Sequence, residues 1–289
     1  MKYPPSSSTS PVTAKSAIGV IIRDKKARLI YEKNSERLIY PASITKLLTA
    51  LTAIEIVVKN NISPITLVEV AESDDIEGSG RNLKPGDRLS FLDCIANLLI
   101  SSSNMSANVI AREMGGILVA RGTDSNAAPT DCFIREMNLV ARQLRMKNAY
   151  FINAHGLANK AQRCSARDLS LLVKKCSENT IIRGLWNKLR YTIPVHGENA
   201  REISIKSSFI FSTLSEVPAI NIPQFRGGKS GALWPSYFNL AAVSALNPGT
   251  TLISVTAGSP SPKERYNDYL SMVRLGQELT ASEQTTPSS

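Results

Sequence analysis

The sequence predicts an α+β protein: a five-stranded antiparallel sheet flanked by helices, with a helical subdomain inserted between its strands. Apolar runs near the N-terminus alternate as in a strand pair, whereas apolar residues in the middle of the chain recur every three or four positions. Strand-like runs then return before a final amphipathic segment. A sheet that takes strands from both ends of the chain, with helices between them, is the simplest arrangement of these elements.

Each element has its own local pattern. Two short apolar runs at 17–23 and 28–33, separated by Asp24-Lys-Lys, predict a β-hairpin. A largely buried helix is expected from Ser43 onward, because its apolar residues share one face: Leu47, Leu48, Leu51, Ile54 and Val57. Further helices are expected at about 91–100, 105–117, 131–144, 167–177 and 263–279. Further strands are expected at 224–232, 237–244 and 250–256.

The two ends of the chain differ from the rest in composition. Residues 1–14 are rich in Pro, Ser and Thr, and residues 280–289 are small and polar, so we expect neither segment to be ordered. Between them we expect one domain, residues 15–279, with its helical subdomain at about 60–205. No apolar segment of signal-peptide length opens the chain, so an export signal lies outside this sequence or the protein stays in the cytosol.

Composition argues against several classes of partner. The net charge is +10, but the basic residues are scattered and aromatic residues make up 6%, so we expect no nucleic-acid partner. A solvated surface explains the charge, and an anionic polymer or a membrane surface would also suit it. The four cysteines show no Cys-x-x-Cys spacing and there are two histidines, so we expect free, partly buried thiols, no metal and no cofactor.

The first motif with chemical meaning is Ser43-Ile-Thr-Lys46 at the start of the long apolar helix. Residues three apart share a helix face, so the Lys46 amine can reach the Ser43 hydroxyl. The helix N-terminus also supplies backbone N–H groups, as an activated serine needs for its oxyanion. Taken alone, the pattern is equally that of a helix-capping serine followed by a surface lysine.

Two further motifs follow in order. Ser102-Ser-Asn104 precedes a helical run, although Ser106 and Ser177 begin similar triplets and a plain helix cap explains any one of them. Lys229-Ser-Gly231 follows two glycines in a strand-like segment. Together the three motifs form the signature of penicillin-binding proteins and serine β-lactamases, in which Ser-x-x-Lys, Ser-x-Asn and Lys-Thr-Gly surround one site.

The chain resembles the serine D-alanyl-D-alanine carboxypeptidases, the low-molecular-mass penicillin-binding proteins, over almost all of residues 17–275. The segments at 39–50, 99–108 and 227–231 are similar to that family's three motifs, and 146–157 is similar to a stretch that class A β-lactamases lack. The resemblance implies a β-lactamase/DD-peptidase-like fold. It also implies that His155 belongs to a structural turn, whereas we expect His196 to be exposed.

The resemblance also implies roles for individual residues. Ser43 would attack the penultimate D-alanine carbonyl, neutral Lys46 would take its proton, and Ser102 would pass a proton to the leaving amine. The remaining expected groups bind substrate: Asn104 its amide, Lys229, Ser230 and Gly231 its terminal carboxylate region, and the backbone N–H groups of Ser43 and Ala232 the oxyanion. Lys229 would also lower the pKa of Lys46.

The resemblance further implies a partner, a place and some departures. The expected substrate is a peptidoglycan stem peptide and the expected covalent inhibitors are β-lactams, outside the cytoplasm or in the periplasm. The protein would be a monomer with at most peripheral membrane association. Ser230 replaces the commoner threonine, Met105 stands where many relatives have aspartate, and 115–131 is expected to be a long surface loop.

Three alternatives stay open. An endopeptidase would use the same residues. A β-lactamase would need a water-positioning carboxylate, and Glu136 is expected on a helix instead. A non-catalytic module with the same fold would have no need to retain Ser43, Lys46, Asn104 and Lys229.

Overall fold

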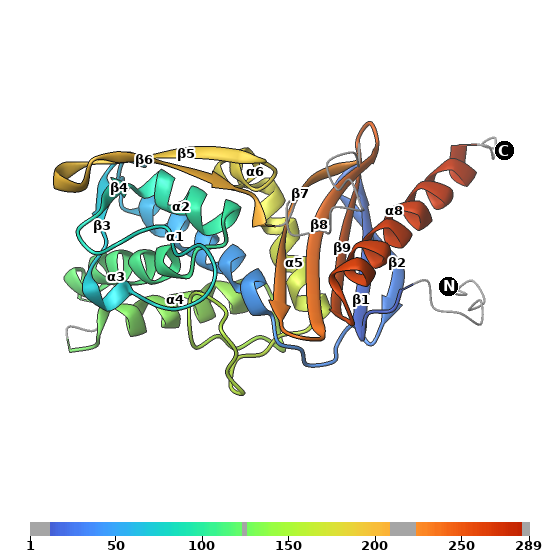
Figure 1. Cartoon of the computed structure of the whole chain (residues 1–289). Helices are drawn as coiled ribbons and strands as arrows, with labels where there is room; N and C mark the ends of the chain where they lie inside the picture. Colours follow the sequence, from blue (N-terminus) through green and yellow to red (C-terminus); the bar gives the residue numbers. More distant parts are fainter. Residues whose placement is uncertain (1–11, 123–125, 209–223, 285–289) are drawn as a thin grey trace.

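The computed structural model describes residues 12–122, 126–208 and 224–284 (Figure 1). The strands of its main sheet are β1 Ser16–Arg23, β2 Lys26–Lys33, β7 Phe225–Leu233, β8 Tyr237–Asn247 and β9 Thr250–Ser259. The helices are α1 Thr45–Lys59, α2 Phe91–Ile100, α3 Asn104–Ala120, α4 Pro129–Gln143, α5 Ala166–Glu178, α6 Thr180–Leu185 and α8 Pro262–Gln284. Two small hairpins complete the fold: β3 Leu67–Glu69 with β4 Arg88–Ser90, and β5 Arg190–Val195 with β6 Arg201–Lys206.

The main sheet is five-stranded and antiparallel, in the order β2-β1-β9-β8-β7, which confirms the expected fold class. Its first strand pairs with its last over their whole length, from Ser16 opposite Ala257 to Arg23 opposite Thr250. Strands from the two ends of the chain therefore form one open sheet, with β7 at one edge. This edge faces the helical part of the molecule (Figure 1).

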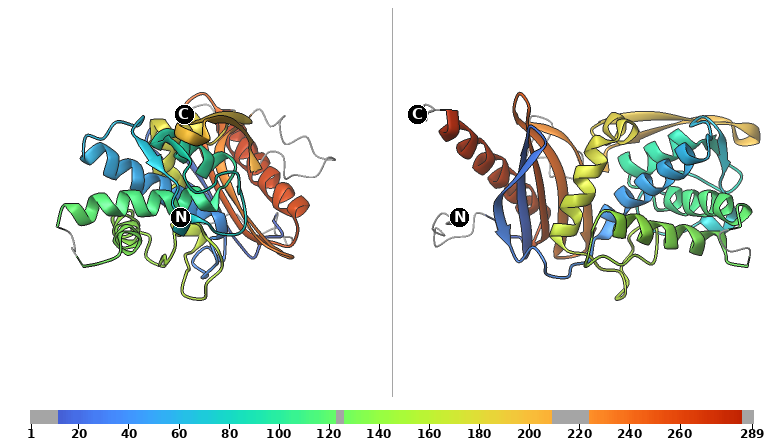
Figure 2. Two further views of the ribbon diagram at one scale, coloured as in Figure 1. Left: turned by 60° about the vertical axis from the view of Figure 1, so that its left-hand side comes forward. Right: turned by 180° about the vertical axis from the view of Figure 1, so that it is seen from behind.

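Helices cover both faces of the sheet. α8 packs on one face, where Tyr269 and Met272 bury against Leu240 and Leu252 (Figure 2). α5 packs on the other face, between the sheet and the remaining helices. The sheet is thus the middle layer of three, and its inner face abuts the helical part.

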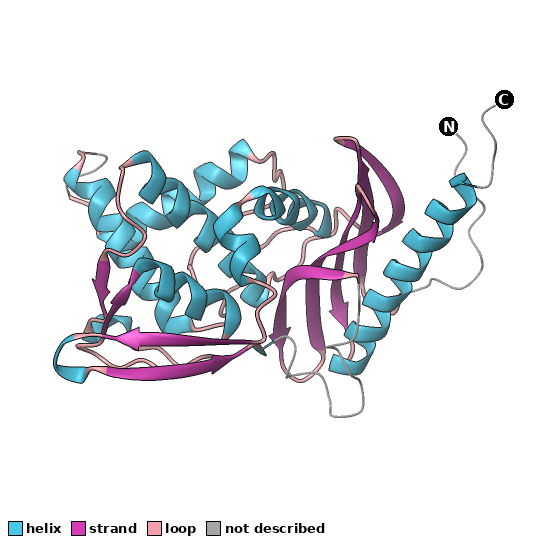
Figure 3. Cartoon of the chain, turned by 90° about the horizontal axis from the view of Figure 1, so that it is seen from above, coloured by secondary structure: helices cyan, strands magenta, loops and turns pink. Residues whose placement is uncertain are grey.

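α1 is the central helix of the helical part, as its apolar spacing predicts. Leu47, Leu48, Leu51 and Ile54 are all buried, and α2, α3, α4 and α5 pack around this helix. The hairpin β5–β6 lies across these helices as a long arm that reaches away from the sheet (Figure 3). Near the tip of this arm, Arg201 forms a bidentate ion pair with buried Asp87, at 2.6 Å for each bond.

One expected loop is largely helical. We predicted a long surface loop at 115–131, but α3 continues to Ala120 and α4 begins at Pro129. Gly115 permits this close helix pair, because a Cβ atom there would lie 1.8 Å from the Pro129 carbonyl oxygen. What remains between the helices is short, and residues 123–125 of it lie outside the described residues.

The ordered chain also extends past both expected limits. Val12 and Ala14 are buried, because the Asp268 carboxylate accepts hydrogen bonds from the backbone N–H groups of Thr13 and Ala14. At the other end α8 continues to Gln284, so the prediction that 280–289 lacks order was wrong for 280–284. Residues 1–11 and 285–289 of the two predicted tails lie outside the described residues.

Candidate active site

The predicted nucleophile lies in a tight turn that leads into α1. Ser43 is in the 3-10 turn Ala42–Ile44, directly before Thr45. Ala42 has a φ of 50°, in the left-handed region. Gly156 allows the neighbouring loop to approach, because a Cβ atom there would lie 2.0 Å from the Ala42 carbonyl oxygen. The loop that contains Gly156 therefore packs directly against the nucleophile turn.

The Lys46 amine lies one helical turn from Ser43 and is fully buried. Its Nζ atom is 2.9 Å from Ser43 Oγ, 2.8 Å from Asn104 Oδ1 and 2.6 Å from the His155 carbonyl oxygen. The amide and carbonyl oxygens can only accept hydrogen bonds. A neutral amine would donate its two hydrogens to these oxygens, and its lone pair would then face the Ser43 hydroxyl.

The electrostatics favour that neutral form. Burial lowers the pKa of Lys46 well below its ordinary value, and the charge on Lys229 lowers it further. The family resemblance implied the effect of the Lys229 charge, and burial is the larger of the two causes. A neutral lysine beside a serine hydroxyl can act as a general base.

The second motif is held in place by a neighbouring loop. Asn104 Nδ2 donates to the Glu77 carbonyl oxygen at 2.8 Å, which directs Oδ1 toward Lys46. Gly78 permits this contact, because a Cβ atom there would lie 2.5 Å from Asn104 Nδ2. Ser102 has a φ of 63° and lies just before Ser103, which caps α3.

The third motif brings a second buried amine to the same place. Lys229 on β7 donates to Ser102 Oγ at 2.9 Å. Burial first, and then the charge of Arg265, lower the pKa of Lys229 to about 7. Gly231 lets β7 run along the nucleophile turn, because a Cβ atom there would lie 3.1 Å from the Ser43 backbone nitrogen. Ser230 and Ala232 flank it, so all the predicted site residues lie in one cluster.

Arg265 is a residue of this cluster that no sequence motif predicts. It lies in the first turns of α8, only 4% exposed, with its guanidinium 5.9 Å from the centre of the Phe238 ring. Burial lowers the pKa of Arg265 to about 10. Among the described residues, no carboxylate pairs with it. The site thus contains buried cations, Lys229 and Arg265, that lack a carboxylate partner in the described chain.

Comparison with known proteins gives the same assignment as the motifs. A sequence profile of the D-alanyl-D-alanine carboxypeptidase family matches residues 4–259. The chain belongs to this family. Curated relatives in the D-alanyl-D-alanine carboxypeptidase family include the carboxypeptidase DacF of Bacillus subtilis, 25% identical over 89% of this chain and 61% of DacF.

Other relatives extend the comparison. DacC of Escherichia coli is 25% identical over 86% of this chain and 58% of DacC. The D-alanyl-D-alanine endopeptidase of Pseudomonas aeruginosa is 27% identical over 59% of this chain and 51% of that protein. The chain therefore spans only about three fifths of the length of the curated carboxypeptidases DacF and DacC.

Solved structures of the same fold cover nearly the whole chain. The crystal structure of the Streptomyces K15 DD-transpeptidase has a TM-score of 0.78 and 19% identity, covering 96% of this chain and 99% of that one. Penicillin-binding protein D2 of Listeria monocytogenes, with cefotaxime bound, has a TM-score of 0.71 and 20% identity, covering 92% and 97%. These likenesses confirm the predicted fold.

Three further residues discussed in the sequence analysis, His155, His196 and Met105, lie in different surroundings. His155 contributes its carbonyl oxygen to Lys46, while its Nδ1 atom accepts from the Leu157 N–H at 3.1 Å. Burial and the Lys46 charge lower the pKa of His155 to about 4, so its ring is neutral near pH 7. His196 is exposed, as expected. Met105 is buried among the apolar side chains of the helical part.

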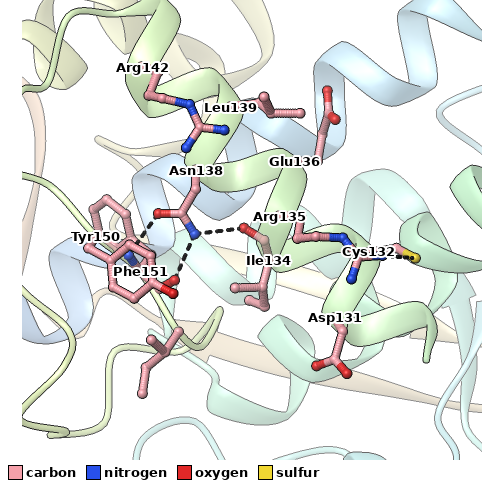
Figure 4. A pocket seen from close by; sticks show the side chains of 11 residues that line it. Asp131, Cys132, Ile134, Arg135, Glu136, Asn138, Leu139, Arg142, Tyr150 and Phe151 are labelled. Atoms are coloured by element: carbon pink, nitrogen blue, oxygen red, sulfur yellow. Dashed lines mark hydrogen bonds between the residues drawn. The ribbon is translucent and has the colours of Figure 1, made fainter. Parts of the chain in front are cut away.

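A separate pocket of about 590 Å³ lies beside α4 (Figure 4). Glu136 lines it together with Arg135, Asn138 and Tyr150, but no residue of the Ser43 cluster does. Glu136 is on helix α4, as expected. A second pocket that it lines places it with Glu55 and Lys59 in the C-terminal half of α1, at the other end of this helix from Ser43.

Metal ligands and membrane-spanning helices are both absent from the described part of the chain. No group of His, Cys, Asp and Glu side chains there is arranged to hold a metal ion. None of the described helices combines the length and the apolar character needed to cross a membrane. All four cysteines are free and buried, which is more burial than the sequence led us to expect.

Proposed function

We propose that this chain is a serine DD-peptidase that hydrolyses the terminal D-Ala-D-Ala bond of peptidoglycan stem peptides through an acyl-enzyme on Ser43. The observation that carries the proposal is the position of the buried Lys46 amine, which lies 2.9 Å from Ser43 Oγ with oxygen acceptors at its other contacts. Family membership supports the same reaction.

The first step would form a bond between Ser43 Oγ and the penultimate D-alanine carbonyl carbon. The hydroxyl proton would move to neutral Lys46 as the bond forms. The carbonyl oxygen would become an oxyanion, and the backbone N–H groups of Ser43 and Ala232 would stabilise it by donating hydrogen bonds.

The second step would break the peptide bond, and the leaving amine then needs a proton. The Ser102 hydroxyl accepts a hydrogen bond from Lys229 and can donate its own proton to the departing nitrogen. Ser102 would take in exchange the proton that Lys46 had received from Ser43, so Lys46 would be neutral again when terminal D-alanine leaves. Lys46 would then accept a proton from a water molecule as the water attacks the ester, and return that proton to Ser43 Oγ as the ester bond breaks.

The buried cations would select the substrate's end. Lys229, Ser230 and Arg265 would bind the terminal carboxylate, with Gly231 giving the space for the substrate to lie against β7, and Asn104 would contact the substrate amide. Because the pKa of Lys229 is only about 7 in the free site, a bound carboxylate would raise it and hold the proton there. The same carboxylate on a penicillin would bring its β-lactam carbonyl to Ser43, and ring opening would acylate the serine.

Several properties belong with this proposal. Stem peptides of peptidoglycan and β-lactams would be the partners, and the protein would act outside the cytoplasm as a monomer with at most peripheral membrane contact. An endopeptidase activity on D-alanyl cross-links is a second candidate, because one relative carries that name. A β-lactamase activity has less support, since Glu136 is outside the cluster.

The test is acylation with a fluorescent penicillin, followed by mass spectrometry of the labelled peptide. We expect a stable adduct on Ser43 and none in Ser43→Ala, with unchanged thermal unfolding. Ser63→Ala, on an exposed serine before β3, is the matched control and should label as the wild type does. Labelling that persists in Ser43→Ala, or rapid turnover of the penicillin, would contradict the proposal.

Release of D-alanine from a pentapeptide would then separate the candidate activities. A carboxypeptidase would release free D-alanine from the monomeric peptide. An enzyme that cleaved only a cross-linked peptide dimer would be the endopeptidase.

A further inference from the structure

The turn after the third motif carries the most exposed large apolar side chain of the described chain. Trp234 is 76% exposed and lies between the end of β7 at Leu233 and the start of β8 at Tyr237. An indole this exposed leaves a large apolar face in water, which is unfavourable for solubility.

The indole is held in place despite its exposure. Its ring packs edge-to-face on Phe238, with 5.1 Å between ring centroids and an interplanar angle of 90°. Phe238 is buried, pairs with Ala232 across the two strands and lies under the Arg265 guanidinium. Trp234 is therefore fixed to the same scaffold that positions Ala232 and Arg265, while its outer surface stays free.

The proposed function gives the substrate a direction along β7. Its terminal carboxylate would lie near Lys229 and Ser230, and its scissile carbonyl near the N–H of Ala232. The acyl part of the peptide must then continue in the same direction, past Leu233. Trp234 is two residues beyond Ala232, about 7 Å along an extended chain, and the substrate residue that precedes the acyl D-alanine would lie about half as far along, within the length of an indole side chain from Trp234.

We propose that Trp234 is a substrate-contacting residue that selects the side chain preceding the acyl D-alanine. The chemistry of an indole face favours an unbranched alkyl chain that ends in an ammonium group: the methylenes pack on the ring and the cation is attracted to its π electrons. The preferred residue at this position is thus a diamino acid such as lysine. This inference rests on the proposed DD-peptidase function.

The test compares three peptides that differ at one residue: Nα-acetyl-L-Lys-D-Ala-D-Ala and the same peptide with norleucine or alanine in place of lysine. In Trp234→Ala we expect kcat/KM to fall about fivefold for the lysine peptide and less than about twofold for the alanine peptide. The loss of kcat/KM for the norleucine peptide should be intermediate, and Trp234→Phe should retain part of the preference for the lysine peptide. Ile65→Ala is the control: it changes a 74% exposed residue just before β3, away from the sheet, and should leave kcat/KM unchanged for all three peptides.

Two results would overturn the inference while leaving the function intact. One is an equal loss for all three peptides in Trp234→Ala, and the other is no loss for any. If the wild-type protein cleaved none of the peptides and took up no penicillin, the proposed function would fail, and the inference with it.

A binding measurement does not depend on the folding of a Trp234 variant. In Ser43→Ala, which retains Trp234, the lysine peptide should protect indole fluorescence from quenching by acrylamide. Trp186, the other tryptophan, is only 5% exposed and contributes little to this quenching. Unchanged quenching at a peptide concentration that saturates the site would overturn the contact.

Discussion

Two regions of this molecule differ in whether their buried charged side chains have an ion-pair partner among the described residues. In the helical part, the buried carboxylates Asp74 and Asp87 each face an arginine, at 2.7 Å for Arg112 and 2.6 Å for Arg201. At the candidate active site, Lys229 and Arg265 are buried without any carboxylate among the described residues. The pKa of an arginine moves in opposite directions in the two regions: hydrogen bonds to Asp74 raise that of Arg112, whereas burial lowers that of Arg265.

The presence or absence of a partner decides whether a buried charge is compensated in the folded protein or is a cost to it. A buried ion pair compensates much of the desolvation of both charges, so losing one partner is costly. An unpaired buried cation is itself a cost to folding, and under the proposed function the substrate carboxylate would supply the missing partner. The two regions should therefore respond oppositely when a cation is removed.

The largest expected effect is on activity at the unpaired site. Lys46→Met should lower the rate of acylation by penicillin at least about a thousandfold, because a general base is lost. Its thermal unfolding temperature should fall only slightly, because methionine leaves the Asn104 and His155 oxygens without the Lys46 donor but breaks no ion pair. Lys59→Met, on the exposed end of the same helix, is the control and should acylate normally. A Lys46→Met variant that is strongly destabilised but acylates normally would contradict the assignment of Lys46 to activity and not to stability.

The paired region should show the reverse behaviour. Arg201→Met should lower the free energy of unfolding by about 3 kcal/mol, because Asp87 would stay buried without its partner. Denaturant unfolding measures this loss, and acylation by the folded fraction should stay within about threefold. Arg81→Met breaks the exposed pair with Asp75 and should cost less than about 1 kcal/mol. Equal losses of unfolding free energy in Arg201→Met and Arg81→Met would show that the burial of Asp87 adds nothing to the effect of breaking the ion pair.

The pH dependence of stability sharpens the comparison at Lys229. Its folded pKa of about 7 is below the unfolded value near 10.5, so between these values the unfolded state binds the additional proton. The wild type should therefore gain stability relative to Lys229→Met as the pH rises from 7 to 10, by at most about 1.4 kcal/mol per unit. Below pH 7 the difference should be constant. A difference that shrinks with rising pH would contradict the lowered pKa.

The smallest expected effect is at Ser230. Ser230→Thr keeps the hydroxyl and adds a methyl group, so acylation should stay within about threefold of the wild type. Ser230→Ala would remove the proposed hydrogen bond to the substrate carboxylate and should cost about tenfold in kcat/KM for a D-Ala-D-Ala peptide. A larger loss for threonine than for alanine would mean that the site has no space for the methyl group.

Local sequence patterns predicted much of the fold because their signals are local. The helix at 91–100 and the strand near 237–244 each have a strong apolar period, and both occur close to the expected limits. The short hairpins β3–β4 and β5–β6 were missed: β5 contains Pro194, and its exposed face lies opposite polar side chains of β6. Helix α3 continues past Gly115 and Gly116, and Gly115 leaves room there for the Pro129 carbonyl of α4, a contact between helices that residue patterns do not contain.

The sequence by itself determined the order and identity of the three motifs, and so the chemistry available to Ser43, Lys46, Ser102, Asn104 and Lys229. It also determined the fold class, because strand and helix periods follow from the spacing of apolar residues. Only the tertiary structure decided that Arg265 joins this cluster and that Trp234 stands beside it. Both positions depend on contacts with Phe238, made by parts of the chain that no local period relates. Burial, which sets the direction of the pKa shifts at Lys46 and Lys229, likewise exists only once the sheet and the helical part have packed together.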